Sequence, residues 1–310
     1  MSRAAIVVNP NAGSAPGRGE ALSRRLAERL RVRGGGAETV LFDMQRNRPG
    51  SWRQRLEAAI AQGVERVFVL GGDGTVLAVA TVLLERDLPL GIVPLGTANL
   101  LARDLGLPLQ PEEAIDLLPD AVVRRIDVGR VNGMPFLCAS MLGLTTALAR
   151  TREAARHAGP LRLWGRLLRK TITMLGRYPY WQVRLELNGE TVALRTRAMV
   201  ITNNPVNPVP GLFPPRERLD GGLLGVYGVH QGPRWELPRL ALRLVNGGWP
   251  EEPRIFHYDA PRLGIRARRK RRVTVMNDGE RLRLSLPLQY EILPCALPLL
   301  LPADSDGVVR

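Results

Sequence analysis

The stretch VFVLGGDGT, residues 67–75, decides the fold prediction. A short apolar run rich in β-branched residues leads directly into three glycines arranged around Asp73. The helix-like run Val76–Ala80 follows, so the pattern predicts a strand, a tight turn and a helix. Such a junction places bare backbone N–H groups and a helix N-terminus at the end of a buried strand, where anions bind well. An ordinary turn in which Asp73 only caps the helix would give the same pattern.

Two further loops occupy the same position relative to predicted strands. The loop NPNAG, residues 9–13, follows a strand over 4–8 and precedes a helix over 18–33. The loop PLGTAN, residues 94–99, follows a strand over 91–93 and precedes the helical run 100–105. Because all three loops lie at the carboxyl ends of predicted parallel strands, we expect them to form one ligand site.

The ordered set of loops resembles the catalytic domain of diacylglycerol kinases and their bacterial lipid-kinase relatives, a family that includes sphingosine and ceramide kinases. In that family the Asn-Pro-x-x-Gly, Gly-Gly-Asp-Gly-Thr and Pro-x-Gly-Thr-x-Asn loops build the nucleotide site. The resemblance continues through Ile126–Gly129, Leu219–Leu224 and Asp278–Glu280, and therefore covers nearly the whole chain. The nucleotide contacts that it implies are Asn9, Pro10, Asn11, Ala12, Gly13, Thr39, Gly71, Gly72, Asp73, Gly74, Thr75, Gly96, Thr97 and Asn99.

The resemblance implies that the γ-phosphoryl group of ATP is transferred, with Mg²⁺, to the hydroxyl of a diacylglycerol-like or sphingoid lipid. This chemistry needs a phosphate cradle, a metal ion and a base that accepts the hydroxyl proton. Asp73 is the acid expected beside the metal-bound phosphates and is a second candidate for the base. The family places its proton acceptor at the glutamate of an Asp-Gly-Glu motif, here Glu280, and Asp278 is expected to shape the turn or assist the metal. From spacing alone, the same motif is also an ordinary hairpin turn.

Three features depart from the family pattern. Ala78 stands where a glutamate is usual, and Leu100 stands where an aspartate often follows the asparagine. The segment 220–225 keeps only one of three acids, Asp220. In bacterial relatives this segment holds a structural Mg²⁺, so either Asp220 replaces the missing carboxylate as a metal ligand or that metal is lost.

The predicted fold class is α/β with two domains. Residues 1–125 alternate strands and helices, which predicts an N-terminal doubly wound parallel-sheet nucleotide domain. Residues 126–290 are expected to form a mostly antiparallel β-sandwich that receives the lipid. Within them, Asn132-Gly133 and Asn188-Gly189 predict type I′ hairpins. The apolar tail 291–310 is expected to return to the first domain.

The remaining elements follow from periodicity and capping signals. A capping box at Ser51 opens one helix, and Pro111 followed by two acids opens another. Further strands are predicted over 37–42, 122–131, 136–141, 181–187, 191–201, 262–275 and 282–286, and further helices near 144–158, 160–176 and 234–245.

Composition and charge limit the kinds of protein that this chain can be. The chain of 310 residues has a formal net charge of +15, and Lys170 and Lys270 are its only lysines. No apolar run reaches the ~18 residues of a membrane span, and two cysteines are too few for a disulfide framework. We therefore expect a cytoplasmic protein that associates peripherally with an anionic membrane surface. The densest basic cluster, 266–272, is either the solvated face and turn of a β-ribbon or a membrane-docking patch.

Other functions remain open at this point. An NAD kinase shares the Gly-Gly-Asp-Gly-Thr loop, but the loop 94–99 and the lack of an Asn-Glu pair in mid-chain disfavour it. A nucleotide-binding regulatory protein without catalysis would account for the lost acids. Nucleic acid is not expected as a partner, because no recognition motif is visible and only 5% of residues are aromatic. The acceptor lipid and the presence of a homodimer are left open.

Overall fold

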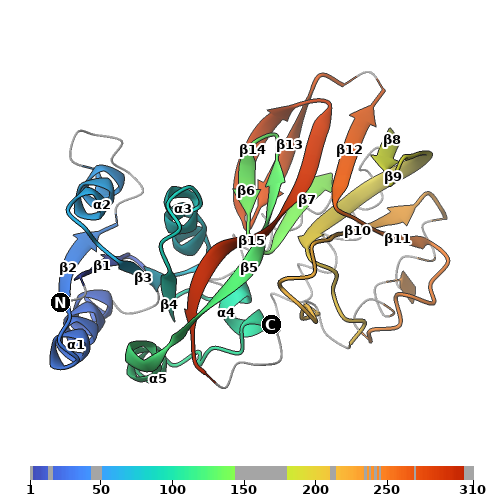
Figure 1. Cartoon of the computed structure of the whole chain (residues 1–310). Helices are drawn as coiled ribbons and strands as arrows, with labels where there is room; N and C mark the ends of the chain where they lie inside the picture. Colours follow the sequence, from blue (N-terminus) through green and yellow to red (C-terminus); the bar gives the residue numbers. More distant parts are fainter. Residues whose placement is uncertain are drawn as a thin grey trace. The chain divides into compact units, whose positions relative to one another are not determined.

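The computed structural model describes residues 3–12, 17–42, 51–143, 180–209, 214–233, 236, 239–240, 243, 246–268 and 270–303 (Figure 1). The chain divides into two compact units. Unit 1 comprises Met1–Val128, Arg218–Asp220 and Pro294–Arg310. Unit 2 comprises Gly129–Glu217 and Gly221–Leu293.

Unit 1 is built on a parallel sheet. Its strands are β1 (Arg3–Val8), β2 (Gly36–Leu41), β3 (Arg66–Gly71) and β4 (Leu90–Pro94), and the end of β15 (Leu288–Leu301) pairs in parallel with β4. The order is β15-β4-β3-β1-β2, and β1 pairs in parallel with both β2 and β3. The strand order therefore reverses between β1 and β3, which is where open α/β sheets bind ligands. The prediction of a doubly wound sheet is confirmed.

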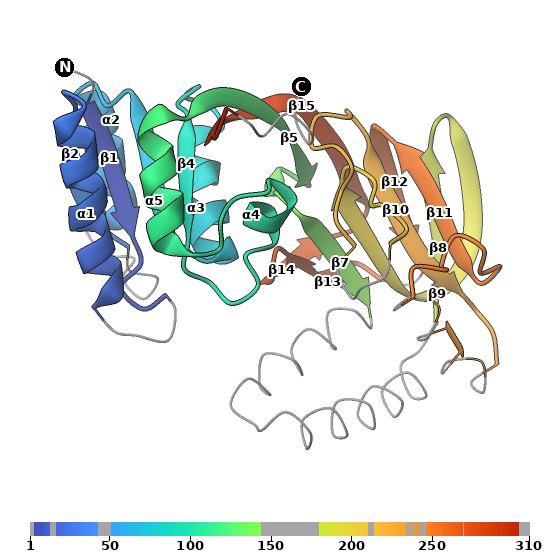
Figure 2. The ribbon, with the colours of Figure 1, turned by 90° about the horizontal axis from the view of Figure 1, so that it is seen from below.

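Helices cover both faces of this sheet. Figures 1 and 2 show α1 (Arg18–Val32) and α5 (Pro111–Leu117) on one face, with α2 (Trp52–Ala61) and α3 (Asp73–Leu83) on the other. The predicted apolar stripe of α1, at four-residue spacing, is buried against strand residues such as Ile6 and Phe68. The Ser51 side chain caps α2 by accepting a hydrogen bond from the Gln54 N–H at 3.5 Å. Pro111 is the first residue of α5, as predicted. The buried residues of the α1 stripe are Leu22, Leu26 and Leu30.

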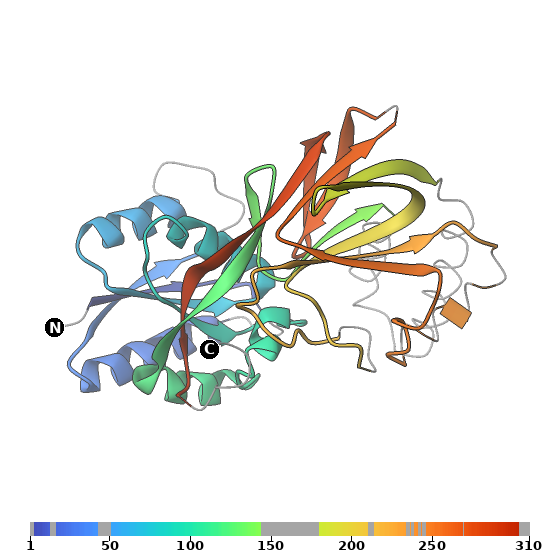
Figure 3. The same ribbon diagram turned by 45° about the vertical axis from the view of Figure 1, so that its right-hand side comes forward.

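Unit 2 is mostly antiparallel β, as predicted. Strand β9 (Glu190–Asn203) is central, because it pairs with three strands: β7, β8 and β10. The sheet order is β14-β13-β7-β9-β8-β12-β15, and β10 also pairs with β11. Figure 3 shows β5 (Val122–Val131, green) beside β15 (red). The other strands are β6 (Met134–Phe136), β7 (Ala139–Gly143), β8 (Trp181–Leu187), β10 (Leu224–His230), β11 (Ile255–Ala260), β12 (Arg262–Ala267), β13 (Arg272–Asn277) and β14 (Glu280–Ser285).

Tight turns join three pairs of these strands. Asn132-Gly133 has φ values of 45° and 83°, and Asn188-Gly189 has 51° and 81°. Asp278-Gly279, between β13 and β14, has 46° and 93°. Positive φ at both central residues is the type I′ signature, so the two predicted Asn-Gly hairpins are confirmed. The Asp-Gly pair forms the same kind of turn.

Two segments that were each predicted to be one continuous strand are divided in the structure. The predicted strand 136–141 is split, because the N–H groups of 137–139 donate to the Asp278 carboxylate instead of to a strand. The predicted strand 262–275 is also split, because β12 pairs with β8 and β15 whereas β13 pairs with β7 and β14. The predicted helices near 144–158 and 160–176 lie outside the described residues, as does most of 234–245. Across the described ranges, no helix is long and apolar enough to cross a membrane.

Candidate active site

The loop after β1 is tied to the loop after β3. The Asn9 backbone N–H donates to the Leu70 carbonyl at 3.0 Å, and its side-chain Nδ2 donates to Thr75 Oγ1 at 2.9 Å. The Asn9 Oδ1 atom accepts from the Asn11 N–H at 3.0 Å, and the Asn9 carbonyl accepts from Ala12 at 3.1 Å. Asn9 therefore organises its own loop and orients the hydroxyl of Thr75. Of the other two predicted residues in this loop, Pro10 is half-buried and Gly13 lies outside the described residues.

The loop after β4 is packed directly against the loop after β3. A Cβ atom on Gly96 would lie 2.6 Å from the Gly72 Cα, and one on Gly72 would lie 3.0 Å from the Gly96 Cα. The Leu95 N–H donates to the Gly71 carbonyl at 2.9 Å. Glycine is therefore needed at both contact positions because the two backbones touch.

Asn99 holds the third loop in its own conformation. Its Oδ1 atom accepts from the Gly96 N–H and its Nδ2 atom donates to the Gly96 carbonyl, both at 2.9 Å. Asn99 has φ of 47° and precedes α4 (Leu100–Asp104), and it is 8% exposed. Asparagine tolerates this left-handed backbone better than most residues. Asn99 therefore suits the turn by its backbone conformation and stabilises it by its two side-chain hydrogen bonds to Gly96.

Asp73 links the second and third loops. It is the first residue of α3, yet its carboxylate accepts hydrogen bonds from the backbone N–H groups of Asn99, Leu100 and Leu101 at the start of α4. Burial raises the pKa of Asp73, and these N–H groups oppose that rise. The N–H group of Asp73 itself acts in the same direction, so four backbone N–H groups favour the charged form of this carboxylate.

The other predicted nucleotide residues of unit 1 lie on or next to these loops, except for Thr39. Thr75 is 4% exposed, and a Cβ on Gly71 would lie 2.6 Å from its side chain. Gly74 lies half-buried in the first turn of α3, and Thr97 is exposed beside Gly96. Thr39 is exposed on β2, where it pairs with Ile6 of β1.

Asp278 of unit 2 is held inside a backbone cradle. Its carboxylate accepts from the N–H groups of Leu137, Cys138 at 2.9 Å and Ala139 at 2.8 Å. Its own N–H donates to the Ala139 carbonyl at 2.9 Å. Burial raises the pKa of Asp278, while the three N–H groups and the charge of Arg216 oppose the rise. These contacts fix the turn that leads to Glu280.

Arg216 completes this cradle and was not identified from the sequence. It is only 4% exposed, and its Nη1 atom donates to the carbonyls of Leu137 at 2.7 Å and Asn203 at 2.8 Å. The Asn203 Nδ2 atom also donates to the Leu137 carbonyl at 2.9 Å. The segment 137–138 is therefore fixed by Asp278 through its N–H groups and by Arg216 through a carbonyl. In a chain so rich in arginine, no local signal distinguishes this one.

Glu280 lies at the start of β14, half-buried. Burial raises the pKa of its carboxyl group, and the negative charge of Asp278 raises it further. In the part of the chain that the structure describes, its carboxylate has no hydrogen-bond or ion-pair partner. A carboxylate with raised proton affinity and open lone pairs has the profile of a general base.

Asp220 of unit 1 is paired with a cation from the chain itself. The Arg218 Nε atom donates to Asp220 Oδ1 at 2.9 Å, and the Asp220 side chain is 8% exposed. No cluster of three or more His, Cys, Asp or Glu residues suited to a metal occurs among the described residues. The role of Asp220 as a metal ligand stays a prediction; in this structure the Arg218 guanidinium balances the charge of its carboxylate.

Replacing Asp278 with asparagine should lower the stability of unit 2. One acceptor oxygen becomes an NH₂ group that faces N–H donors, and leaving buried donors unpaired costs about 1–3 kcal/mol per group. We expect a clear fall in the urea midpoint. Asp120→Asn is the control, since its exposed pairing with Arg33 contributes little. Equal urea midpoints for the two variants would mean that the hydrogen bonds of the Asp278 carboxylate do not stabilise unit 2.

Comparison with known proteins finds matches to both parts of the chain. A family model described as the diacylglycerol kinase catalytic domain matches residues 3–131, and one described as the YegS C-terminal NAD kinase beta sandwich-like domain matches residues 147–301. A protein named diacylglycerol kinase from Mycobacterium tuberculosis is 29% identical over 266 residues, covering 81% of each chain.

Two further relatives extend the comparison. A protein named "Probable lipid kinase YegS-like" from Pseudomonas aeruginosa is 32% identical over 261 residues, covering 83% of each chain. A crystal structure of a diacylglycerol kinase from Bacillus anthracis str. Sterne shares the fold, with a TM-score of 0.68, 19% identity and 97% coverage of both chains. Because a relative that is 32% identical covers 83% of the chain, and the two family models together match most of it, the chain belongs to the diacylglycerol kinase and YegS-like lipid kinase family.

Proposed function

We propose that the protein is an ATP-dependent lipid kinase that transfers the γ-phosphoryl group to the hydroxyl of a diacylglycerol-like or sphingoid lipid. The observation that carries this proposal is the joining of three loops at the carboxyl ends of β1, β3 and β4. Asn9 is bonded to Thr75, Gly72 touches Gly96, and Asp73 binds the start of α4. The names of the relatives support the lipid acceptor.

In this proposal the loops bind the nucleotide phosphates. The glycine backbone of 71–74 and the N-terminus of α3 offer N–H groups to anions. The hydroxyls of Thr75 and Thr97 can donate to phosphate oxygens. Mg²⁺, when bound with the nucleotide, neutralises charge on the phosphates, and Asp73 is the carboxylate that would hold it.

Glu280 is proposed to accept the proton of the lipid hydroxyl. The pKa of Glu280 is raised toward neutral pH, and a general base is more effective when its pKa lies near the working pH. Asp278 and Arg216 are positioning residues in this scheme, because they fix the turn that carries Glu280. Since the acceptor resides in a bilayer and the chain carries a charge of +15, we infer that the enzyme works at an anionic membrane surface.

The direct test is phosphorylation in vitro. Purified protein should transfer label from γ-labelled ATP to diacylglycerol or a sphingoid base in mixed micelles with Mg²⁺. The absence of labelled lipid across a broad acceptor panel would reject the proposal. Formation of NADP from NAD would instead favour the NAD kinase alternative, and tight ATP binding without turnover on any acceptor would favour a regulatory protein.

Replacing Gly96 with alanine should weaken ATP binding roughly tenfold. The new Cβ would overlap the Gly72 backbone, and overpacking typically costs about 1–3 kcal/mol. Gly36→Ala is the matched control, because a Cβ there meets nothing within 4 Å. Calorimetric titration with ATP measures both variants. Unchanged ATP affinity in Gly96→Ala would mean that the contact between Gly72 and Gly96 is not needed for nucleotide binding.

A further inference from the structure

Four arginines gather on the exposed face of neighbouring strands in unit 2. The strand order is β9, β8 and β12, with β8 in the middle. The side chains of alternate residues point away from the core, and they include Arg184 of β8, Arg195 of β9 and Arg266 of β12. With Arg268, just beyond β12, these residues line a recess of about 760 Å³. The sequence cluster at 266–272 indicated only two of the four.

The arginines oppose one another across the strands. Arg266 stands directly opposite Arg184 in the pairing of β12 with β8. Arg195 stands opposite Gln182, and the Arg268 N–H donates to the Gln182 carbonyl on the other side of the same residue. Like charges in directly opposite positions destabilise a sheet. An anion bound over this face would remove that cost.

Little negative charge offsets this face. The Arg266 Nε atom pairs with Glu186 at 2.6 Å. Arg184 and Arg268 have no carboxylate partner within the described ranges. Their guanidinium groups are exposed and free to bind phosphate oxygens with two donors each.

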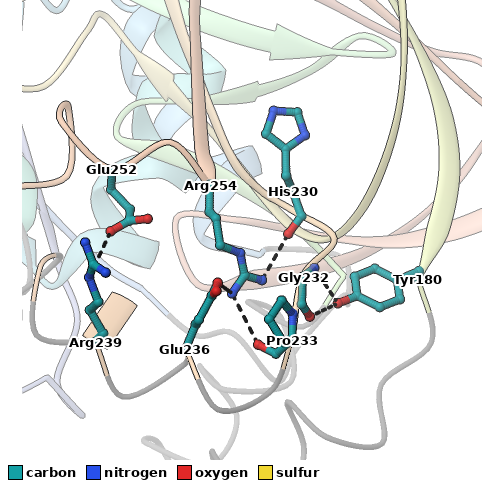
Figure 4. Close-up of polar contacts among 8 residues, drawn as sticks. All are labelled: Tyr180, His230, Gly232, Pro233, Glu236, Arg239, Glu252 and Arg254. Atoms are coloured by element: carbon teal, nitrogen blue, oxygen red, sulfur yellow. Dashed lines mark hydrogen bonds and ion pairs between the residues drawn. The ribbon is translucent and has the colours of Figure 1, made fainter.

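Aromatic side chains lie at one end of this face. A second recess of about 320 Å³ shares Arg195 and Arg268 with the first, and adds Tyr180, Trp181 and Lys270. Figure 4 shows Tyr180 held in place by Gly232, whose carbonyl accepts from the Tyr180 hydroxyl at 3.2 Å. The Lys270 Nζ atom lies 3.5 Å from the centre of the Trp181 ring. Tyrosine and tryptophan beside cationic groups are typical of surfaces that meet lipid head groups.

We propose that this arginine face, defined by Arg184, Arg195, Arg266 and Arg268, docks the protein on an anionic phospholipid bilayer. The occupant follows from charge complementarity and from the aromatic end of the recess. This inference rests on the proposed function, because a kinase whose acceptor is a lipid must reach a membrane. The binding itself requires neither ATP nor turnover.

Vesicle sedimentation of the full-length protein tests the proposal. The protein should sediment with phosphatidylcholine vesicles that contain about one third phosphatidylglycerol, and not with pure phosphatidylcholine. At ~1 M salt, where the Debye length is about 3 Å, this binding should disappear. Arg184→Gln combined with Arg268→Gln should weaken binding about 30-fold, since each arginine near the surface contributes roughly fivefold.

The matched control removes two arginines elsewhere. Arg24 and Arg283 are exposed and unpaired in the described part of the chain, and neither lines the recess. Arg24→Gln with Arg283→Gln should bind vesicles nearly as the wild type does. Equal losses in the two double variants would mean that only net charge matters, and would overturn the proposal. Arg195→Gln provides an independent variant of the same face.

Two further measurements separate the alternatives. Phosphorylation of lipid in neutral detergent micelles should be unchanged in Arg184→Gln with Arg268→Gln. Vesicle sedimentation needs no turnover, so it reports on docking even if the protein has no kinase activity. Gel shift with a duplex oligonucleotide tests another polyanion. If the double variant loses duplex binding while vesicle binding stays at the wild-type level, the face binds nucleic acid and the proposal is wrong.

Discussion

Asp73→Asn should reduce lipid phosphorylation by about 10²–10⁴-fold, the usual cost of losing a key charged group in an active site. The neutral amide cannot balance the charge of Mg²⁺ or accept a proton. It also replaces one acceptor oxygen with an NH₂ group, which cannot accept the hydrogen bonds that the backbone N–H groups of 99–101 donate to the carboxylate. Both the electrostatics and the junction between the second and third loops are therefore affected. Initial rates at saturating ATP and lipid measure the effect.

Thermal stability and ATP affinity separate these two contributions. If Asp73 acts mainly through the start of α4, ATP affinity without Mg²⁺ should fall together with turnover. If it acts on the metal, that affinity should be preserved and the Mg²⁺ dependence should shift to higher concentration. Glu85→Gln, an exposed acid just beyond the other end of α3, is the control. A rate above about one tenth of wild type would remove Asp73 from the mechanism.

The parts of the fold that the sequence predicts are those encoded by short-range chemistry. The apolar stripe of α1, the cap at Ser51 and the Asn-Gly turns each depend on residues a few positions apart. The three loops are also local, and the parallel sheet then brings them to one edge. Their mutual contacts, such as Gly72 against Gly96, follow from that topology.

The unpredicted parts depend on partners far away in the chain. The break between β6 and β7 arises because Asp278, about 140 residues later, takes the N–H groups of 137–139. The tail forms one strand, β15, although it contains Pro294 and Pro298. Its residues 288–291 pair with β12, its residues 299–300 pair with β4, and the strand also pairs with β5. Local periodicity cannot report such partners.

Glu280→Gln should cut lipid phosphorylation about 10²-fold or more while preserving ATP affinity and thermal stability. The glutamine keeps the size of the side chain but cannot accept the hydroxyl proton. Because Glu280 is half-buried and has no bonding partner among the described residues, its replacement removes no stabilising contact. Turnover, calorimetric ATP titration and thermal unfolding should be measured on the same preparation.

The chain supplies a closely matched control at the tip of another hairpin. Glu190 follows Asn188-Gly189 as Glu280 follows Asp278-Gly279, and both turns have positive φ at their central residues. Glu190→Gln should leave turnover unchanged. The pH profile gives a second readout: because the pKa of Glu280 is raised, wild-type activity should fall with acidification at a pH above the ordinary glutamate value of about 4.3. Near-normal turnover in Glu280→Gln would make the motif a structural turn, and Asp73 would remain as the base candidate.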